Sequence, residues 1–206
     1  MRRSKTERQP KQRPLMRLQA PQSGAPSDQL SVQQWHQEFS LEAFRAKYQE
    51  LHFAHRQGLA LIGVIATQLG TYFGYCFKAI GLPTLPWPAY NGALIGGADT
   101  WGSPISQYFA GQSVHFVNGI VFAILFGVLA HSQLPGKHVV KGLIYGVIMT
   151  IVSVGFLVPY AYVPKMGYGL FLMDGPDGWK LPAGVLLWHL IYGFFLGTLF
   201  QPKDEN

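Results

Sequence analysis

Two histidines stand out because they interrupt long apolar stretches. His115 begins the run His-Phe-Val-Asn-Gly, and His189 begins the similar run His-Leu-Ile-Tyr-Gly. Imidazole nitrogens are common axial ligands of haem iron, and histidines on facing helices are one way to hold such a group in a bundle. His115 and His189 are therefore candidate cofactor-binding residues, for haem b or for a chlorophyll-type pigment.

A structural role competes with ligation for the same two rings. His115 lies 11 residues after Pro104, and His189 lies 7 residues after Pro182. At about 1.5 Å per residue, helices that start at these prolines place the rings at heights that differ by about one turn. This offset favours a hydrogen bond from each ring to a neighbouring side chain or backbone carbonyl over shared ligation of one iron. A pigment that takes one histidine as its axial ligand does not require the two rings to lie at the same height.

The sequence carries no other motif of a catalytic or metal site. It has no phosphate-binding loop, no His-Glu-x-x-His and no Gly-x-Ser-x-Gly, and its one cysteine, Cys76, can form no pair within the chain. Charged residues are also missing from the interior of the apolar stretches, where ion-coupled transport usually needs one. We therefore expect no enzymatic activity and no metal site beyond the two histidines.

The two histidines lie within two of four long stretches of the chain that contain no charged residue. Only 13% of the 206 residues are charged, against about a quarter in soluble domains. A helix of about 20 apolar residues crosses a bilayer, and each stretch is long enough for one. The sequence predicts an all-α integral membrane protein with spans at about 57–79, 106–131, 141–163 and 182–201.

Three short patterns occur twice in the same order, which indicates a duplication. They are Gly-Val-Ile-x-Thr, Asp-x-Trp-x-x-Pro and His-x-x-x-Gly. The first residues of the three pairs are Gly63 and Gly146, Asp99 and Asp177, and His115 and His189. Two spans per repeat give both copies the same orientation. We expect a four-helix bundle made of two hairpin repeats, 57–131 and 132–206.

Small residues spaced by four positions give each span a face for close helix packing. In a bilayer the hydrophobic effect does not drive helices together, so their association depends on close contact between backbones, which small residues allow. The helix-packing residues are Gly70, Gly74, Gly119, Gly127, Gly142, Gly146, Gly193 and Gly197. Tryptophans in the loops are expected as anchors at the membrane interface. These anchors are Trp87, Trp101 and Trp179.

The first quarter of the chain has a different composition. Residues 1–27 are basic and poor in apolar side chains, so we expect a tail that is disordered or held by a partner or by anionic lipid headgroups. Residues 28–56 are expected to hold an amphipathic helix with Ser40 as its N-cap. Lys and Arg are concentrated on the side of the two termini, which predicts that both are cytoplasmic. A bacterial inner membrane, or a membrane derived from one, is the expected location.

These features predict a non-catalytic subunit or assembly factor of a larger membrane complex, respiratory or photosynthetic, with other integral membrane subunits as partners and bound lipids. Nucleic acid is not an expected partner. One alternative is a redox or light-harvesting subunit that binds haem b or a chlorophyll-type pigment through His115 and His189. A second alternative is a small uniporter or channel lined by uncharged polar residues.

Overall fold

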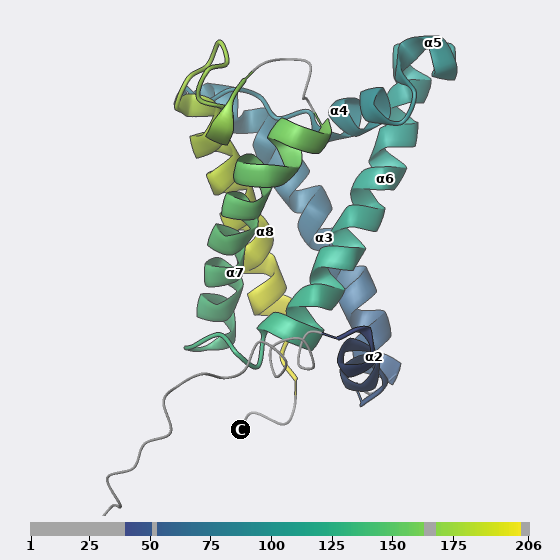
Figure 1. The fold of residues 1–206 in the computed structure, drawn as a ribbon, viewed down its shortest axis with the longest axis vertical. Helices are drawn as coiled ribbons and strands as arrows, with labels where there is room; N and C mark the ends of the chain where they lie inside the picture. The colour runs from purple at the N-terminus through teal and green to yellow at the C-terminus, as the bar shows by residue number, and fades with distance from the viewer. Residues whose placement is uncertain (1–39, 51–52, 163–167, 203–206) are drawn as a thin grey trace, which may run out of the picture. The chain divides into compact units, whose positions relative to one another are not determined.

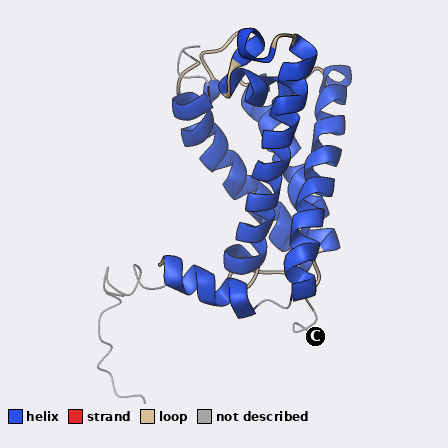
Figure 2. Ribbon diagram, turned by 90° about the vertical axis from the view of Figure 1, so that its right-hand side faces the viewer, coloured by secondary structure: helices blue, strands red, loops and turns tan. Residues whose placement is uncertain are grey.

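The computed structural model describes residues 40–50, 53–162 and 168–202, all within the unit Phe39–Asn206. These residues form helices joined by loops, with no strand among them (Figure 2). The predicted basic tail and residues 28–39 lie outside the described residues. The fold below is therefore that of the helical unit alone.

Four helical segments are long and apolar enough to cross a membrane, which confirms the predicted number and order of spans. They run Gly58–Ile80, Pro104–Ala130, His138–Tyr160 and Lys180–Leu199. Their main parts are α3 (Phe53–Cys76), α6 (Pro104–Leu125), α7 (His138–Val152) and α8 (Lys180–Leu199). Pro104 is the first residue of α6, where its missing N–H costs nothing, and the Ser103 hydroxyl caps this helix by accepting from Ser106 N at 3.1 Å.

The four long helices pack in the spatial order α6, α3, α8, α7. Helix α3 contacts both α6 and α8, and α8 contacts α7. Figure 1 shows α7 and α6 on opposite sides with α3 and α8 between them. Helices α6 and α7 therefore stand apart along much of their length.

Glycines set the close approach of neighbouring helices. A Cβ on Gly63 of α3 would lie 2.7 Å from the carbonyl oxygen of Gly119 on α6. On the other hairpin, a Cβ on Gly142 of α7 would collide with the backbone of α8 at Gly193. Since any side chain at these positions would separate the backbones, the two interfaces depend on glycine.

Short helices cover one end of the bundle. They are η1 (Phe77–Ile80), α4 (Trp87–Leu94), α5 (Gly97–Trp101) and η5 (Leu170–Leu172). Helix α4 packs on the first turns of α6, where a Cβ on Gly111 would collide with the backbone of α4 at Pro88. This end therefore carries a folded cover in place of simple loops.

Helix α2 (Leu41–Glu50) lies at the other end, as part of the amphipathic helix that the sequence predicts. The Ser40 hydroxyl accepts from Ala43 N at 3.0 Å, which confirms Ser40 as the N-cap. Phe44 and Tyr48 stack with ring centroids 6.2 Å apart on the side toward α6. Leu41, by contrast, is 82% exposed, so it does not share this packed face.

Two spans end in π-helical turns that the sequence did not predict. Helix α6 continues into η2 (Phe126–Ala130), and α7 continues into η3 (Ser153–Tyr162). A π-turn shifts the following side chains around the helix axis and is often found at functional sites. Phe126, at the start of η2, is fully buried, and Ser153 and Val158 of η3 are buried as well.

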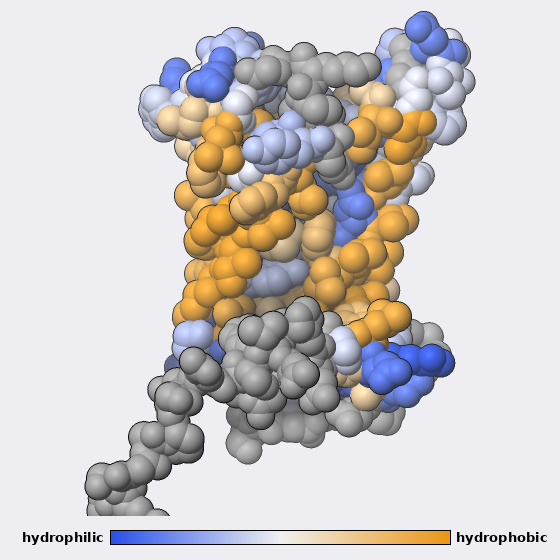
Figure 3. Space-filling view, in the orientation of Figure 1, coloured by the Kyte–Doolittle hydropathy of each residue, from blue (hydrophilic) through white to orange (hydrophobic). Residues whose placement is uncertain are grey.

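The outer surface of the bundle is apolar across its middle. In Figure 3 hydrophobic residues form a broad band, and hydrophilic residues gather toward the two ends. Exposed apolar side chains of this band include Phe109, Val117, Ile151 and Phe156. Such a band matches the hydrocarbon layer of a bilayer in position and chemistry.

Candidate functional site

A cavity of about 270 Å³ lies where α6 and α7 stand apart, and we call it the α6–α7 cavity. Helices α3 and α8 form its floor, and α4 contributes to the end nearest the cover. Its lining residues are Thr67, Trp87, Asn91, His115, Asn118, Gly119, Phe122, Met149, Ser153, Leu157, Val158, Trp188, His189 and Tyr192. Both histidines singled out by the sequence therefore line the same cavity.

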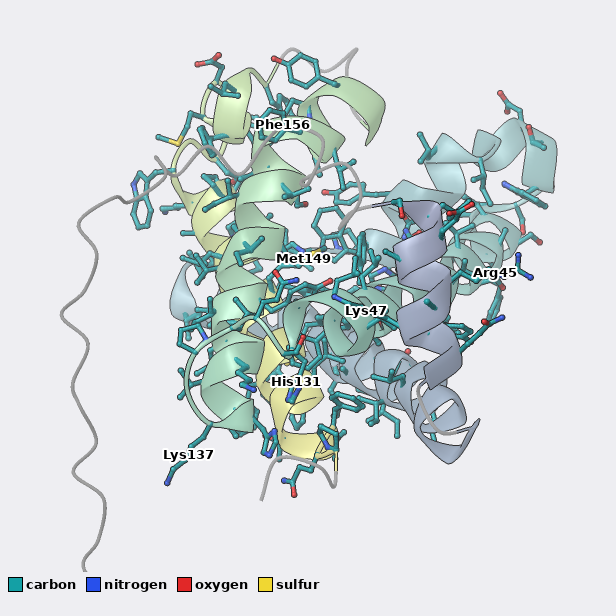
Figure 4. The ribbon with its side chains drawn as sticks, turned by 60° about the horizontal axis from the view of Figure 1, so that its bottom comes forward. Arg45, Lys47, His131, Lys137, Met149 and Phe156 are labelled. Carbon is teal, nitrogen blue, oxygen red and sulfur yellow. The ribbon has the colours of Figure 1, made fainter. Side chains whose placement is uncertain are left out.

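Packed side chains close the cavity at its two ends. Toward the cover, the ring of Trp87 on α4 meets Trp188 on α8 edge to face, with centroids 6.5 Å apart. Toward the other end, the Tyr145 hydroxyl of α7 donates to the carbonyl oxygen of Phe122 on α6 at 2.9 Å. Figure 4 views the bundle from this second end and shows Met149 among the helices, with Phe156 on η3 beyond it.

His115 is anchored to α3 through one ring nitrogen. Its Nε2 lies 3.0 Å from the Thr71 hydroxyl oxygen, and the same hydroxyl donates its proton to the carbonyl oxygen of Thr67 at 2.8 Å. Because a threonine hydroxyl has one proton, it must accept from His115 at the same time. The proton of a neutral His115 ring is therefore on Nε2, and Nδ1 keeps its lone pair.

His189 is anchored within its own helix through the opposite nitrogen. Its Nδ1 lies 2.9 Å from the carbonyl oxygen of Val185, one turn earlier in α8. A carbonyl can only accept, so Nδ1 carries the proton and Nε2 keeps the lone pair. Among the described residues the structure records no hydrogen bond to His189 Nε2 or to His115 Nδ1. Each ring thus keeps one acceptor nitrogen, and both rings line the cavity.

Both rings lie beside the ring of Trp188, although the sequence predicted ring heights that differ by about one turn. Helix α8 begins at Lys180, two residues before Pro182, so His189 is 9 residues from its helix start and His115 is 11 from Pro104. Two residues correspond to about 3 Å along a helix, not to a full turn. The ring of Trp188 lies close to both, with centroids 5.5 Å from His115 and 5.2 Å from His189. The prediction counted from Pro182, and the structure corrects this starting point because α8 begins at Lys180.

Several other polar groups of the cavity are already engaged with the protein. The Tyr192 hydroxyl donates to the carbonyl oxygen of Gly119 at 2.7 Å. The indole nitrogen of Trp188 is buried without a hydrogen bond, and it faces α3, since a Cβ on Gly70 would lie 3.2 Å from it. Three other lining residues carry a buried polar atom without a recorded hydrogen bond, namely Thr67 Oγ1, Trp87 Nε1 and Asn91 Oδ1. A bound molecule would therefore meet these groups as well as the two imidazole acceptors.

The structure distributes the other predicted residues among different surroundings. Trp87 lines the cavity, whereas Trp179 is 63% exposed and Trp101 is partly buried. Gly70 and Gly74 lie against the ring of Trp188, and Gly127 lies against Leu59. Gly146 and Gly197 of the second hairpin lie against the backbones of α8 and α7, respectively.

A second pair of histidines lies at the end opposite the cover. His131 Nε2 and His138 Nδ1 are 3.0 Å apart, and the two rings stack with centroids 5.2 Å apart. His131 packs against Phe200 after the end of α8, while Lys137 projects away from the bundle (Figure 4). In the part of the chain that the structure describes, no three His, Cys, Asp or Glu side chains gather as a metal site.

Comparisons with protein family models, with curated proteins and with solved structures return no match to this chain. The functional proposals that follow therefore rest on the geometry of the α6–α7 cavity.

Proposed function

We propose that this is an integral membrane protein that binds a lipid-soluble small molecule in the α6–α7 cavity. The observation that carries the proposal is the pair of anchored imidazoles in one apolar cavity, each with an acceptor nitrogen left over. Such an acceptor costs about 1–3 kcal/mol once a molecule that supplies no donor covers it. Two of them on different helices are expected where a bound molecule supplies the donors.

The position of the cavity favours a ligand that arrives from the bilayer. The lining residues belong to the four candidate spans and to α4, and the gap between α6 and α7 opens on the apolar band. Ligand pockets between helices of a bundle are mostly apolar with a few converging polar groups, as this one is. A molecule dissolved in the hydrocarbon layer can enter there without crossing the polar cover.

The volume argues for a small head group. Pockets that enclose drug-sized ligands measure about 300–1,000 Å³, and the α6–α7 cavity is slightly below this range at about 270 Å³. One substituted ring with the start of a hydrocarbon tail suits that volume, whereas the macrocycle of haem b or of a chlorophyll-type pigment is larger. The size therefore favours a single-ring ligand over the tetrapyrrole cofactors predicted from the histidines.

Solvent extraction of the protein purified in mild detergent tests this proposal. Mass spectrometry and absorption spectra of the extract should show a lipid-soluble molecule at about one per protein chain. Ser153→Phe places a ring inside the cavity and should abolish co-purification, whereas Ile151→Phe, on the half-exposed outer face of the same span, should not. A folded protein that carries no such molecule, or equal recovery from both variants, would contradict the proposal.

The predicted role as a non-catalytic subunit of a larger complex is compatible with ligand binding and is kept as a second proposal. Many apolar side chains on the outer face suit either lipid or neighbouring subunits. Native electrophoresis in mild detergent, followed by identification of co-migrating chains, tests it. A single band at the mass of the chain with its detergent would contradict the subunit proposal.

The duplicated hairpin and the cytoplasmic termini are also kept as proposals. In support of the duplication, Gly63 of α3 lies against Gly119 of α6, and the matching Gly146 of α7 lies close to Gly193 of α8. In support of the orientation, the exposed Lys137 lies at the same end as Arg45 and Lys47 of α2 (Figure 4). Basic residues at one end of a bundle favour the cytoplasmic side for that end.

A further inference from the structure

We infer that the ligand of the α6–α7 cavity is a hydroquinone, that is, a dihydroxylated ring with a hydrocarbon tail, whose hydroxyl protons are accepted by His115 Nδ1 and His189 Nε2. The inference rests on the proposed function, because it names the chemistry of the molecule that the same cavity binds. It follows from the proton positions that the two anchoring hydrogen bonds impose.

The anchors make both free ring nitrogens acceptors. His189 Nδ1 faces the carbonyl oxygen of Val185, which fixes its proton on that nitrogen. His115 Nε2 faces a hydroxyl whose own proton is already donated to Thr67. A ligand that presents only acceptors, such as the carbonyl oxygens of a quinone, would meet a lone pair at each imidazole, so only the other polar groups of the lining, such as the indole N–H of Trp87, could donate to it.

Hydroxyl groups satisfy the two nitrogens where carbonyl or ether oxygens cannot. The apolar part of the lining can hold the body of a ring, because it includes Phe122, Met149 and Val158, and Trp188 lies beside both imidazoles. A site built around a hydrogen bond discriminates strongly against analogues without the matching group, since its buried polar atoms are then left without a partner. The reduced, hydroxylated form of a ring should therefore bind better than its oxidised or methylated forms.

Binding to the full-length protein in lipid nanodiscs tests the inference. The probes are decylhydroquinone, its dimethyl ether and decylbenzoquinone, which share a ring and a tail and differ in their oxygen substituents. Under anaerobic conditions, we expect the hydroquinone to bind at least about tenfold more tightly than the other two, which corresponds to about 1.4 kcal/mol. Equal affinity for all three probes would overturn the inference and leave the proposed function intact.

Histidine variants test the role of each ring. His189→Phe and His115→Phe keep a ring without an acceptor and leave no buried donor behind, since both anchors receive the proton from histidine. Each should remove most of the preference for the hydroquinone. His189→Gln and His115→Asn can present an amide oxygen near the lost acceptor, and they should restore part of the preference.

His138→Gln serves as the matched control, because His138 is half-buried at the end away from the cavity. It should bind all three probes as the wild type does. If the phenylalanine variants keep the full preference while Ser153→Phe abolishes binding, the cavity is a site but the imidazoles do not select its ligand. If no probe binds and no lipid-soluble molecule co-purifies, the proposed function itself fails.

Discussion

The Nε2 atom of His115 lies 3.0 Å from the hydroxyl oxygen of Thr71, across the interface of α6 and α3. Because this hydroxyl already donates to the Thr67 carbonyl, the contact fixes which nitrogen of the imidazole carries its proton. One hydroxyl on α3 thereby determines that His115 presents an acceptor, and not a donor, to the α6–α7 cavity.

Thr71→Val tests this contact. The substitution keeps the shape of the side chain but removes the acceptor, so the buried N–H of His115 loses its partner at a cost of about 1–3 kcal/mol of unfolding free energy. Thermal or denaturant unfolding in detergent measures the loss. Thr198→Val is the control, because Thr198 is half-buried and its hydroxyl donates to the Phe194 carbonyl oxygen within α8. Equal stability of the two variants would show that the Thr71 contact does not hold the ring.

Gly63→Ala tests the close approach of α3 and α6. The added Cβ would lie 2.7 Å from the Gly119 carbonyl oxygen and 2.9 Å from the Ile120 Cα, which are backbone atoms that cannot move aside. We expect a loss of about 1–3 kcal/mol from overpacking, measured by the same unfolding assay. Gly58→Ala, which has no atom within 4 Å of the new Cβ, should cost nothing. If Gly63→Ala left the free energy of unfolding unchanged, α3 and α6 would have to lie further apart than the structure shows.

The sequence predicted the four candidate spans, and it singled out the two histidines that line the α6–α7 cavity, for reasons that are local. Unbroken apolar stretches bounded by charges give the spans, and an isolated polar ring within one is visible without any structure. Three features could not be derived in this way. The partners of His115 and His189 depend on helix rotation, and the role of α4 as a cover depends on backbone contact at Gly111. The π-turn at Phe126 has no local sequence signal, whereas Pro159 within η3 does mark a break in regular α-helix.

Lys141 illustrates the same limit. By its place in the sequence it belongs to the charged boundary of the third span, where long basic side chains usually reach the interface. In the structure it is only 8% exposed in the first turn of α7. Burial at this position depends on how the ends of the helices meet, which the sequence does not reveal.

Alkaline pH should loosen the cover of the cavity through Tyr90. Burial raises the pKa of this tyrosine above its ordinary value of 10.0, and nearby Tyr168 and Asp177 raise it further. A raised pKa means that the neutral phenol stabilises the fold below pH 10.0, and that this contribution is lost as the pH rises through the folded pKa. As the pH rises through the folded pKa of Tyr90, the melting temperature of Tyr90→Phe should therefore fall less than that of the wild type. An identical alkaline profile in wild type and variant would contradict this assignment.

The orientation of the bundle can be tested by cysteine labelling. In a Cys76→Ala background, Lys137→Cys and Pro176→Cys place single exposed thiols at opposite ends of the bundle. With a membrane-impermeant maleimide, Pro176→Cys should react in intact cells or spheroplasts and Lys137→Cys only after lysis. The reverse pattern would show that the termini face outward.

The most direct test of the account is an experimental structure of the protein crystallised from a lipidic mesophase without added ligand. We expect electron density for a flat ring in the α6–α7 cavity, within hydrogen-bonding distance of His115 Nδ1 and His189 Nε2, and a tail that leaves between α6 and α7. A cavity closed by side chains, or one that holds only water between the two imidazoles, would contradict the account.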